Sequence, residues 1–348
     1  MSSNKFLNKV RLLKLKDNKL IIIIIIAAIY FVTIPFFFRN SSYLLSVIIY
    51  SSILSCASLG VWLTFSIGRI NIGQAAFVGI GGYATAILMT KLDISFWISL
   101  PLSGIIAAFF SLLLGFVLLR LKGIYFSMIT LTLTNLTNLV FLNAVFITRG
   151  ANGIMNIPRP GAVNIGNFTI IPSFRTDSYY ILFYYLVTII LLICFICIWR
   201  LYNSRIGWIF RALRQSETLT QSIGINIIKY RIMAYTICGF LGGISGSLFV
   251  VYIQNIFPES FKVVDSINYM LYCFLGGLDY VFGPILGSFL LTIFFEMLRG
   301  IQKYQQLFYS IILICIMLWI PNGILSIKLS KNKEKQNSMM KKNKKEGI

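Results

Sequence analysis

Apolar runs recur along this chain, separated by shorter polar stretches. Most contain about twenty residues, the length that a helix rising 1.5 Å per residue needs to cross the roughly 30 Å hydrocarbon core of a bilayer. The pattern therefore predicts an all-α polytopic integral membrane protein. The predicted runs are 20–38, 43–67, 73–91, 94–119, 124–148, 179–201, 232–254, 266–281, 283–299 and 306–326.

The eighth and ninth runs are short and meet at a Gly-rich stretch. If every run is a full crossing the chain has ten membrane helices, whereas a re-entrant hairpin built from the two short runs leaves eight. The residues of the predicted helix break are Gly276, Gly277, Gly283 and Pro284. Irregular backbone at membrane depth is tolerated only where protein shields it or where it lines a cavity, so the break is a candidate functional element.

The longest polar passage between two apolar runs is Ser204–Tyr230. Its first half predicts a helix with one apolar face, at positions i, i+3, i+4 and i+7. That face consists of Ile206, Ile209, Phe210 and Leu213. Arg214 and Glu217 are three residues apart, which predicts an ion pair on the exposed side, and Gly224 and Asn226 predict a turn. The passage fits either a helix lying on the bilayer surface or a short helix presented to a soluble partner.

Two predicted spans carry stripes of small residues at helical spacing, which predict close packing between helices. The stripe residues are Ala75, Gly79, Gly82 and Ala86 in the third run and Gly239, Gly243 and Gly246 in the seventh. Polar side chains in the third and fifth runs indicate either interhelical hydrogen bonds or the lining of a pathway. These pathway-lining candidates are Asn71, Gln74, Ser127, Thr130, Thr134 and Asn138.

Composition agrees with a membrane protein, because 57% of the residues are hydrophobic and only 12% are charged, which is less charge than a soluble surface carries. The net charge of +21 could suggest nucleic acid, but its distribution argues against such a partner. With the N-terminus inside, 23 of the 31 Lys and Arg residues fall in segments on the cytoplasmic side. This asymmetry follows the positive-inside rule and predicts that both termini are cytoplasmic.

The same topology divides the chain into three parts. Residues 1–19 form a basic cytoplasmic N-terminus, 20–327 a transmembrane domain, and 328–348 a Lys-rich cytoplasmic tail, expected to be disordered and attracted to anionic membrane lipid. A cytoplasmic loop covers 202–230 and a long external loop covers 149–178. The external loop is long enough for a lid or for a surface that docks a soluble protein.

Side chains that catalyse reactions are scarce. The chain has no histidine and no P-loop or metalloprotease motif. The six cysteines lie in apolar runs, and the C-x-x-C of Cys194 and Cys197 is interpreted as helix packing rather than as a metal or redox site. Glu296 is followed by Arg299, which predicts a local ion pair rather than an ion path. The sequence therefore predicts no metal site, no bound cofactor and no enzyme activity, which leaves transport or gating.

The chain resembles the LivM-type membrane subunit of ABC importers for branched-chain amino acids. The resemblance spans about residues 43–327 and rests on several stretches that occur in family order. They are GRINIGQAAFVGIGGYATAIL (68–88), RLKGIYFSMITLT (120–132), TRGANGIMNIP (148–158), SRIGWIFRALRQSETLTQSIGINIIKYRIMAY (204–235), GFLGGISGSLF (239–249), FPESF (257–261), FLGGLDYVFGPILGS (274–288) and WIPNGIL (319–325).

This resemblance implies that Ser204–Tyr230 forms the cytoplasmic coupling loop, which seats in a groove of a partner ATPase. The residues that match the family's R-x-x-R-x-x-E…G-I-N pattern are Arg211, Arg214, Glu217, Gly224 and Asn226. The implied protein is a permease subunit in the cytoplasmic (inner) membrane that forms half of a translocation pathway. Its implied partners are a second, LivH-type permease, two cytosolic ABC ATPase subunits that use ATP, and an extracytoplasmic substrate-binding protein.

Branched-chain amino acids are the cargo that the resemblance implies, with other amino acids, urea and short amides as alternatives. The competing function is an ion-coupled secondary transporter of small polar solutes, whose sites would lie at broken helices near the bilayer midplane. Such a transporter needs a buried carboxylate without a cationic neighbour, and Glu296 fits poorly because Arg299 follows it. An intramembrane enzyme is disfavoured by the lack of histidine and of paired acids.

Overall fold

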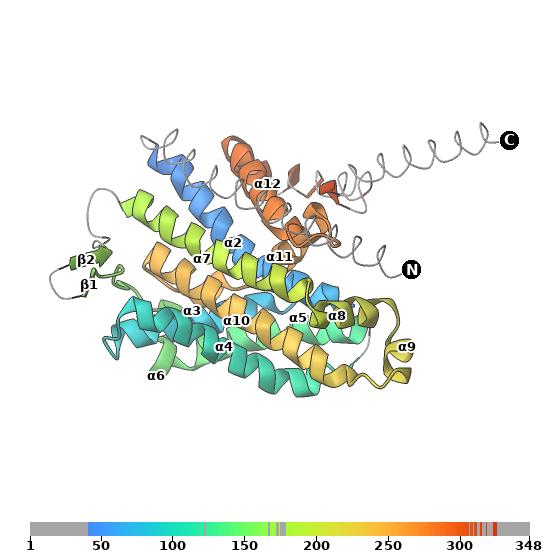
Figure 1. The fold of residues 1–348 in the computed structure, drawn as a ribbon. Helices are drawn as coiled ribbons and strands as arrows, with labels where there is room; N and C mark the ends of the chain where they lie inside the picture. The colour runs from blue at the N-terminus through green and yellow to red at the C-terminus, as the bar shows by residue number, and fades with distance from the viewer. Residues whose placement is uncertain are drawn as a thin grey trace.

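The computed structural model describes residues 41–121, 123–165, 168–171, 174 and 179–305, with individual positions from 307 to 325. These residues form a bundle of helices with a small two-stranded sheet at one end (Figure 1). The predicted first run, 20–38, and both predicted tails lie outside the described residues, and the last run, 306–326, is described at only a few positions.

Every predicted run between 43 and 299 corresponds to a helix. The long helices are α2 (Ser42–Ser66), α3 (Gln74–Thr90), α4 (Phe96–Leu118), α5 (Ile124–Asn143), α7 (Tyr179–Tyr202), α10 (Ile227–Ile253), α11 (Val263–Gly276) and α12 (Gly283–Met297). Among the described residues, 6 helices are long and apolar enough to cross a membrane, namely α2, α4, α5, α7, α10 and the stretch Gly283–Gly300. The predicted fold class, an all-α polytopic membrane protein, is confirmed.

Short elements connect these helices. They are α6 (Val145–Thr148), α8 (Arg205–Gln215), α9 (Glu217–Ser222), the 3₁₀ helices η1 (Gly150–Asn152), η2 (Pro258–Ser260) and η3 (Leu298–Tyr304), and the strands β1 (Val163–Ile165) and β2 (Phe168–Ile171). The two strands pair antiparallel as a hairpin. In Figure 1 the hairpin lies at one end of the bundle and α8 and α9 lie at the opposite end.

Helices α2 and α10 form the centre of the bundle. Helix α10 packs against α2, α3 and α4, and α2 packs in addition against α7, α11 and α12. The small residues predicted to allow close packing lie at these crossings. A Cβ atom added at Gly243 would lie 2.9 Å from the Gly104 Cα of α4, and one at Gly246 would lie 2.8 Å from the Gly82 nitrogen of α3. Side chains at either position would force the helices apart.

The other stripe residues also lie in contacts. Gly239 faces Ser111 of α4, and Gly79 faces the rings of Phe141 and Phe261, with a Cβ-to-ring distance of 3.2 Å to Phe261. The remaining members, Ala75 and Ala86, are fully buried. The stripes therefore lie where helices meet, because only small side chains leave room for a neighbouring backbone or ring.

The helix break lies where the sequence predicts it. Helix α11 ends at Gly276, Gly277 has a positive φ of 110°, and α12 begins at Gly283 with Pro284 in its first turn. The 14 residues of α11 span about 21 Å, less than the hydrocarbon core. The stretch that begins with α12 and ends at Gly300 reaches 18 residues. The indole nitrogen of Trp62 donates a hydrogen bond of 2.9 Å to the Leu278 carbonyl, which attaches the break to α2.

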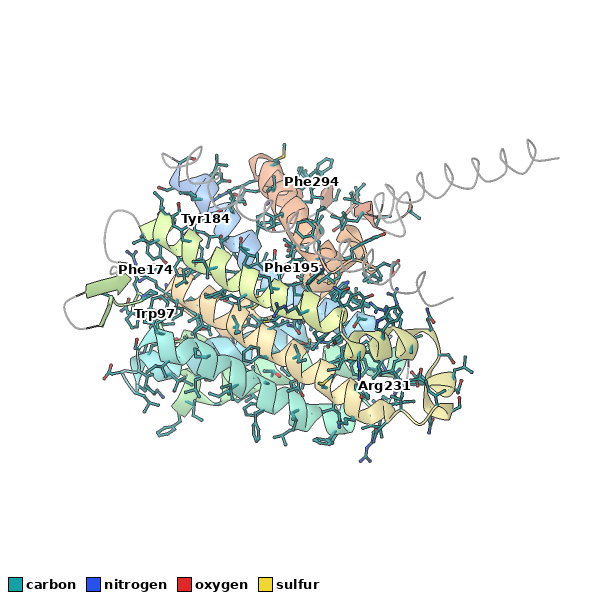
Figure 2. All side chains as sticks on the ribbon, viewed as in Figure 1. Trp97, Phe174, Tyr184, Phe195, Arg231 and Phe294 are labelled. Atoms are coloured by element: carbon teal, nitrogen blue, oxygen red, sulfur yellow. The ribbon has the colours of Figure 1, made fainter. Side chains whose placement is uncertain are left out.

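The long loop after α5 packs onto the end of the bundle opposite α8 and α9. Ile154 forms a β-bridge with Ile256, which follows α10. Trp97 of α4 donates a hydrogen bond of 3.2 Å to the Gly161 carbonyl, and the Trp97 ring contacts Phe174. Figure 2 shows Trp97 and Phe174 side by side at this end. The loop thus forms a structured surface over the helix ends.

Candidate functional site

The polar segment 204–230 folds as two short helices and the start of α10. Ser204 caps α8 by accepting a hydrogen bond from the Ile206 nitrogen. Ser216 is extended, with φ −157° and ψ 118°, and caps α9 by accepting from the Leu219 nitrogen. Asn226 accepts a hydrogen bond of 3.1 Å from the Lys229 nitrogen and so caps α10. Each helix begins at a residue whose side chain satisfies an otherwise unpaired backbone N–H group, which stabilises the start of that helix.

The predicted turn lies between α9 and α10. Gly224 has φ 80°, and a Cβ atom there would meet nothing within 4 Å. Its backbone nitrogen donates a hydrogen bond of 2.9 Å to the Gln221 carbonyl. Gly224 is therefore required for its left-handed backbone conformation and not for lack of space, since other L-residues rarely adopt that conformation.

The predicted apolar face of α8 is buried against the bundle. Phe210 is 0% exposed and Leu213 is 2% exposed, and Ile206 and Ile209 are half-buried. The opposite surface of the segment exposes large apolar side chains. Trp208, Leu219 and Ile223 are 68%, 70% and 71% exposed. The segment thus has one face buried against the bundle and large apolar side chains exposed elsewhere on its surface.

Glu217, the first residue of α9, contacts two arginines of the bundle. Its Oε1 atom lies 3.2 Å from Nη2 of Arg69, in the connection between α2 and α3, and forms a second ion pair with Nη2 of Arg231 in α10. Arg69 and Arg231 are 3% and 5% exposed. Burial lowers the pKa of the Arg69 guanidinium, the charge of Arg231 lowers it further, and Glu217 raises it. An arginine nevertheless stays protonated.

The predicted pairing of Arg214 with Glu217 is wrong. Arg214 instead lies 3.0 Å from the Asp279 carboxylate in the helix break. The prediction assumed one continuous helix, but α8 ends at Gln215 and Ser216 is extended. The two side chains are therefore not neighbours on one helix face, which is the condition for an i,i+3 ion pair.

Arg211 is held by aromatic rings rather than by an acid. Its guanidinium lies 4.5 Å from the Tyr202 ring centroid and 4.3 Å from that of Trp208, and it donates a hydrogen bond of 3.2 Å to the Tyr202 carbonyl. The Tyr202 ring in turn packs edge-on against Trp62 of α2. These contacts connect the segment to the centre of the bundle through stacked side chains.

Three residues of this site were not identified from the sequence as partners of the segment: Arg69, Arg231 and Asp279. In the sequence, Arg69 and Arg231 stand out only as part of the asymmetric distribution of positive charge, and nothing near Asp279 indicates its partner. One signal was available, because Arg69 and Arg231 each border an apolar run and a buried arginine requires a counter-charge. The pairing itself joins positions far apart in sequence, so no local pattern contains it.

Asn71 and Gln74 are fully buried between α2, α3 and α10. The Gln74 amide nitrogen donates to the Ala57 carbonyl at 3.0 Å, and its amide oxygen accepts from the Cys238 thiol at 2.8 Å. The Asn71 side-chain oxygen accepts from the Gly73 nitrogen at 2.9 Å. These contacts are the interhelical and local hydrogen bonds that the sequence left as one alternative, and pathway lining by the same side chains stays a prediction.

The polar face of α5 also makes contacts within the chain. Ser127 donates to the Ile70 carbonyl at 2.9 Å, Thr130 accepts from the Ile72 nitrogen at 3.1 Å, and Asn138 donates to the Pro258 carbonyl at 2.6 Å. Thr134 lies 3.3 Å from the Ser266 hydroxyl. This face joins α5 to the connection before α3 and to the region around α11, and its role in a pathway likewise stays a prediction.

Two further sequence predictions concern polar side chains outside this segment. Glu296 and Arg299 form the predicted ion pair, at 2.8 Å. Cys194 is buried and Cys197 is exposed, and both are free thiols. Within the part of the chain that the structure describes, no group of three His, Cys, Asp or Glu residues could hold a metal ion.

Replacing Asn226 with alanine is expected to destabilise the start of α10 by about 1 kcal/mol, because the Lys229 N–H group loses its acceptor. Thermal unfolding of the purified protein in detergent would measure the loss. Asn226→Asp retains an acceptor oxygen and should unfold close to the wild-type temperature. Equal unfolding temperatures for Asn226→Ala and the wild type would contradict the capping role.

These features define a multi-pass helical membrane protein with a rigid polar segment fixed to one end of its bundle. The chain belongs to the family described as "Branched-chain amino acid transport system / permease component", which matches residues 43–317. The resemblance drawn from the sequence motifs is thereby confirmed. No solved structure matches the chain.

Curated relatives agree with this assignment. The chain is 31% identical over 271 residues to the high-affinity branched-chain amino acid transport system permease protein LivM of Salmonella typhimurium and, to the same extent, of Escherichia coli. These alignments cover 74% of this chain and 64% of each relative, so the chain spans less than two thirds of their length. It is 23% identical over 321 residues to a probable LivH permease of Methanocaldococcus jannaschii, covering 82% of this chain and 92% of that protein.

Proposed function

We propose that this chain is a membrane-spanning permease subunit of an ATP-binding-cassette importer and forms half of the pathway for branched-chain or related amino acids across the cytoplasmic (inner) membrane. The observation that carries the proposal is segment 204–230. Its helices are capped at each start and fixed to the bundle by Phe210, Leu213 and Glu217. A rigid segment of this kind can transmit a push from a soluble partner to the membrane helices.

The partner at this segment is a pair of cytosolic ABC ATPase subunits that bind and hydrolyse ATP. The exposed apolar side chains Trp208, Leu219 and Ile223 supply the surface that an ATPase groove would bury. Burial of apolar surface favours binding, and Trp is among the residues that contribute most to the affinity of protein contacts. Arg211, Arg214, Gly224 and Asn226 hold the shape of the segment. The permease itself binds no cofactor, and ATP is used by the partners.

The remaining partners complete the transporter. A second, LivH-type permease forms the other half of the pathway. An extracytoplasmic substrate-binding protein delivers the solute at the opposite end of the bundle, where the loop before α7 forms a structured surface with its hairpin. Closure of the two ATPases on ATP moves both coupling segments and shifts the helices between two arrangements, so the permease requires no catalytic residue.

The expected result is that the ATPase subunits co-purify with this chain, and that liposomes containing the whole transporter take up radiolabelled leucine only with the binding protein and ATP. A variant of the ATPase that binds but does not hydrolyse ATP should abolish uptake. Uptake by this chain alone, driven by a proton or sodium gradient, would contradict the proposal and support a secondary transporter. Uptake of a different solute under the same ATP dependence would change only the cargo.

A further inference from the structure

The ion pairs of Glu217 connect three separate parts of the chain. Glu217 belongs to α9, Arg69 to the connection between α2 and α3, and Arg231 to the first turns of α10. Both arginines direct Nη2 at the same carboxylate atom, Oε1. Figure 2 shows Arg231 at the end of the bundle from which α8 and α9 project. Through Glu217, segment 204–230 thus contacts both the α2–α3 connection and α10.

The contact of Glu217 with the two arginines is expected to affect stability strongly, because it brings two buried positive charges to one negative charge. Two cations that are each more than nine-tenths buried share one carboxylate. Among the described residues, Nε and Nη2 of both arginines lack a hydrogen-bond acceptor of good geometry. Removing the acidic partner of a buried charge is strongly destabilising, because the remaining charge is left without its counter-ion. Moving Glu217 away from the arginines is therefore expected to be costly unless these elements move with it.

The two arginines lie close in sequence to residues that pack in the centre of the bundle. Arg69 is followed by Asn71 and Gln74, which bond to Cys238 of α10. Arg231 lies on α10 itself, the helix that packs against α2, α3 and α4. A displacement of α9 would therefore act on α3 through Arg69 and on α10 through Arg231.

We propose that Glu217 is a positioning residue that transmits the movement of α9 to α3 and α10 through Arg69 and Arg231, and that it acts within this chain rather than as a contact to the ATPase. The proposal rests on the proposed function, because it assigns the coupling role within the same segment. The resemblance to the family places Glu217 in a loop that seats in the ATPase, whereas the proposal assigns its carboxylate to contacts within this chain. The side chain of Glu217 is 31% exposed and its Oε1 faces inward to both arginines.

The experiment uses the whole transporter in liposomes and measures three quantities: the ATPase subunits retained on purification, the rate of ATP hydrolysis, and the solute taken up per ATP hydrolysed. Glu217→Gln is expected to retain the ATPase subunits and to hydrolyse ATP, while uptake per ATP falls at least about tenfold, within the range of typical coupling between sites. Gln221→Ala, at an exposed position of the same helix, is the matched control: it leaves the ion pairs of Glu217 in place and should leave the uptake per ATP hydrolysed unchanged.

A charge exchange tests the mechanism within the chain. Glu217→Arg combined with Arg231→Glu keeps two cations and one anion at the site and should restore part of the uptake per ATP that Glu217→Arg alone loses. An ATPase contact at Glu217 would not be restored by changing Arg231, because Arg231 is buried. Failure of the exchange to restore any coupling, in a variant that still retains the ATPase, would overturn the proposal.

The remaining outcomes of the experiment are also decisive. Loss of the ATPase subunits from Glu217→Gln, or a fall of uptake and hydrolysis in equal proportion, would overturn the proposal in favour of a direct contact. If Glu217→Gln does not fold, Glu217→Asp decides, since it keeps the charge but withdraws the carboxylate by one carbon. A reduced uptake per ATP supports the proposal, and an unchanged ratio overturns it. Absence of the ATPase from the wild-type complex would instead refute the proposed function.

Discussion

Replacing Gly246 with leucine is expected to prevent assembly of the helix bundle. A Cβ atom at this position would lie 2.8 Å from the Gly82 nitrogen and 2.9 Å from the Val78 carbonyl carbon, so it would meet backbone and not a side chain that can rotate away. Overpacking a tight core costs about 1–3 kcal/mol and at times more, and leucine adds a whole side chain at the crossing of α10 and α3. The fraction of monodisperse protein on size-exclusion chromatography would measure the effect.

Gly300→Ala is the control for this substitution. A Cβ atom at Gly300 would meet nothing within 4 Å, so the variant should elute as the wild type does. Gly246→Ala should lie between the two, because it adds only the one atom that meets the backbone. A Gly246→Leu variant that elutes and unfolds like the wild type would refute the close crossing of α3 and α10.

Replacing Trp62 with alanine is expected to lower the stability of the protein by about 3–5 kcal/mol, the range found for truncating a large buried aromatic side chain. Trp62 is 0% exposed, and its ring packs at 4.9 Å from the Tyr202 ring, which in turn holds Arg211 of α8. The indole nitrogen also donates to the Leu278 carbonyl in the helix break. The substitution therefore removes a contact between the core, the break and the polar segment at once.

Trp62→Phe separates the contribution of ring packing against Tyr202 from that of the hydrogen bond to the Leu278 carbonyl. It keeps an aromatic ring against Tyr202 but removes the N–H donor, so the Leu278 carbonyl loses its partner at a cost of about 1 kcal/mol. Thermal unfolding in detergent compares the variants, and limited proteolysis within 277–282 reports on the break. If Trp62→Ala unfolded no earlier than Trp62→Phe, the ring would contribute nothing beyond its hydrogen bond.

Taken together, the contacts of segment 204–230 link it to the bundle at several points. Glu217 reaches the α2–α3 connection and α10, Arg214 reaches the helix break, and Arg211 reaches α2 through Tyr202. The contact of Glu217 with the two buried arginines is expected to affect the free energy of unfolding most when it is broken. The Arg214–Asp279 pair is exposed and contributes little to that free energy. The ion pairs of Glu217 are therefore expected to contribute more to fixing the segment than the Arg214–Asp279 pair does.

The sequence by itself determined the long helices between 43 and 299, their approximate bounds and the position of the break. These features follow from local rules: an apolar run long enough for a bilayer, and glycine and proline where the helix stops. The small-residue stripes also predicted close packing, because their helical spacing is visible in the sequence alone.

Only the tertiary structure decided which partner each polar side chain takes. Arg214 pairs with Asp279 and Glu217 with Arg69 and Arg231. These contacts join residues far apart in sequence, and the extended backbone at Ser216 turns α9 away from the line of α8. Helical spacing predicts neighbours only within one continuous helix, so the ion pairs that fix the segment depend on how separate helices pack.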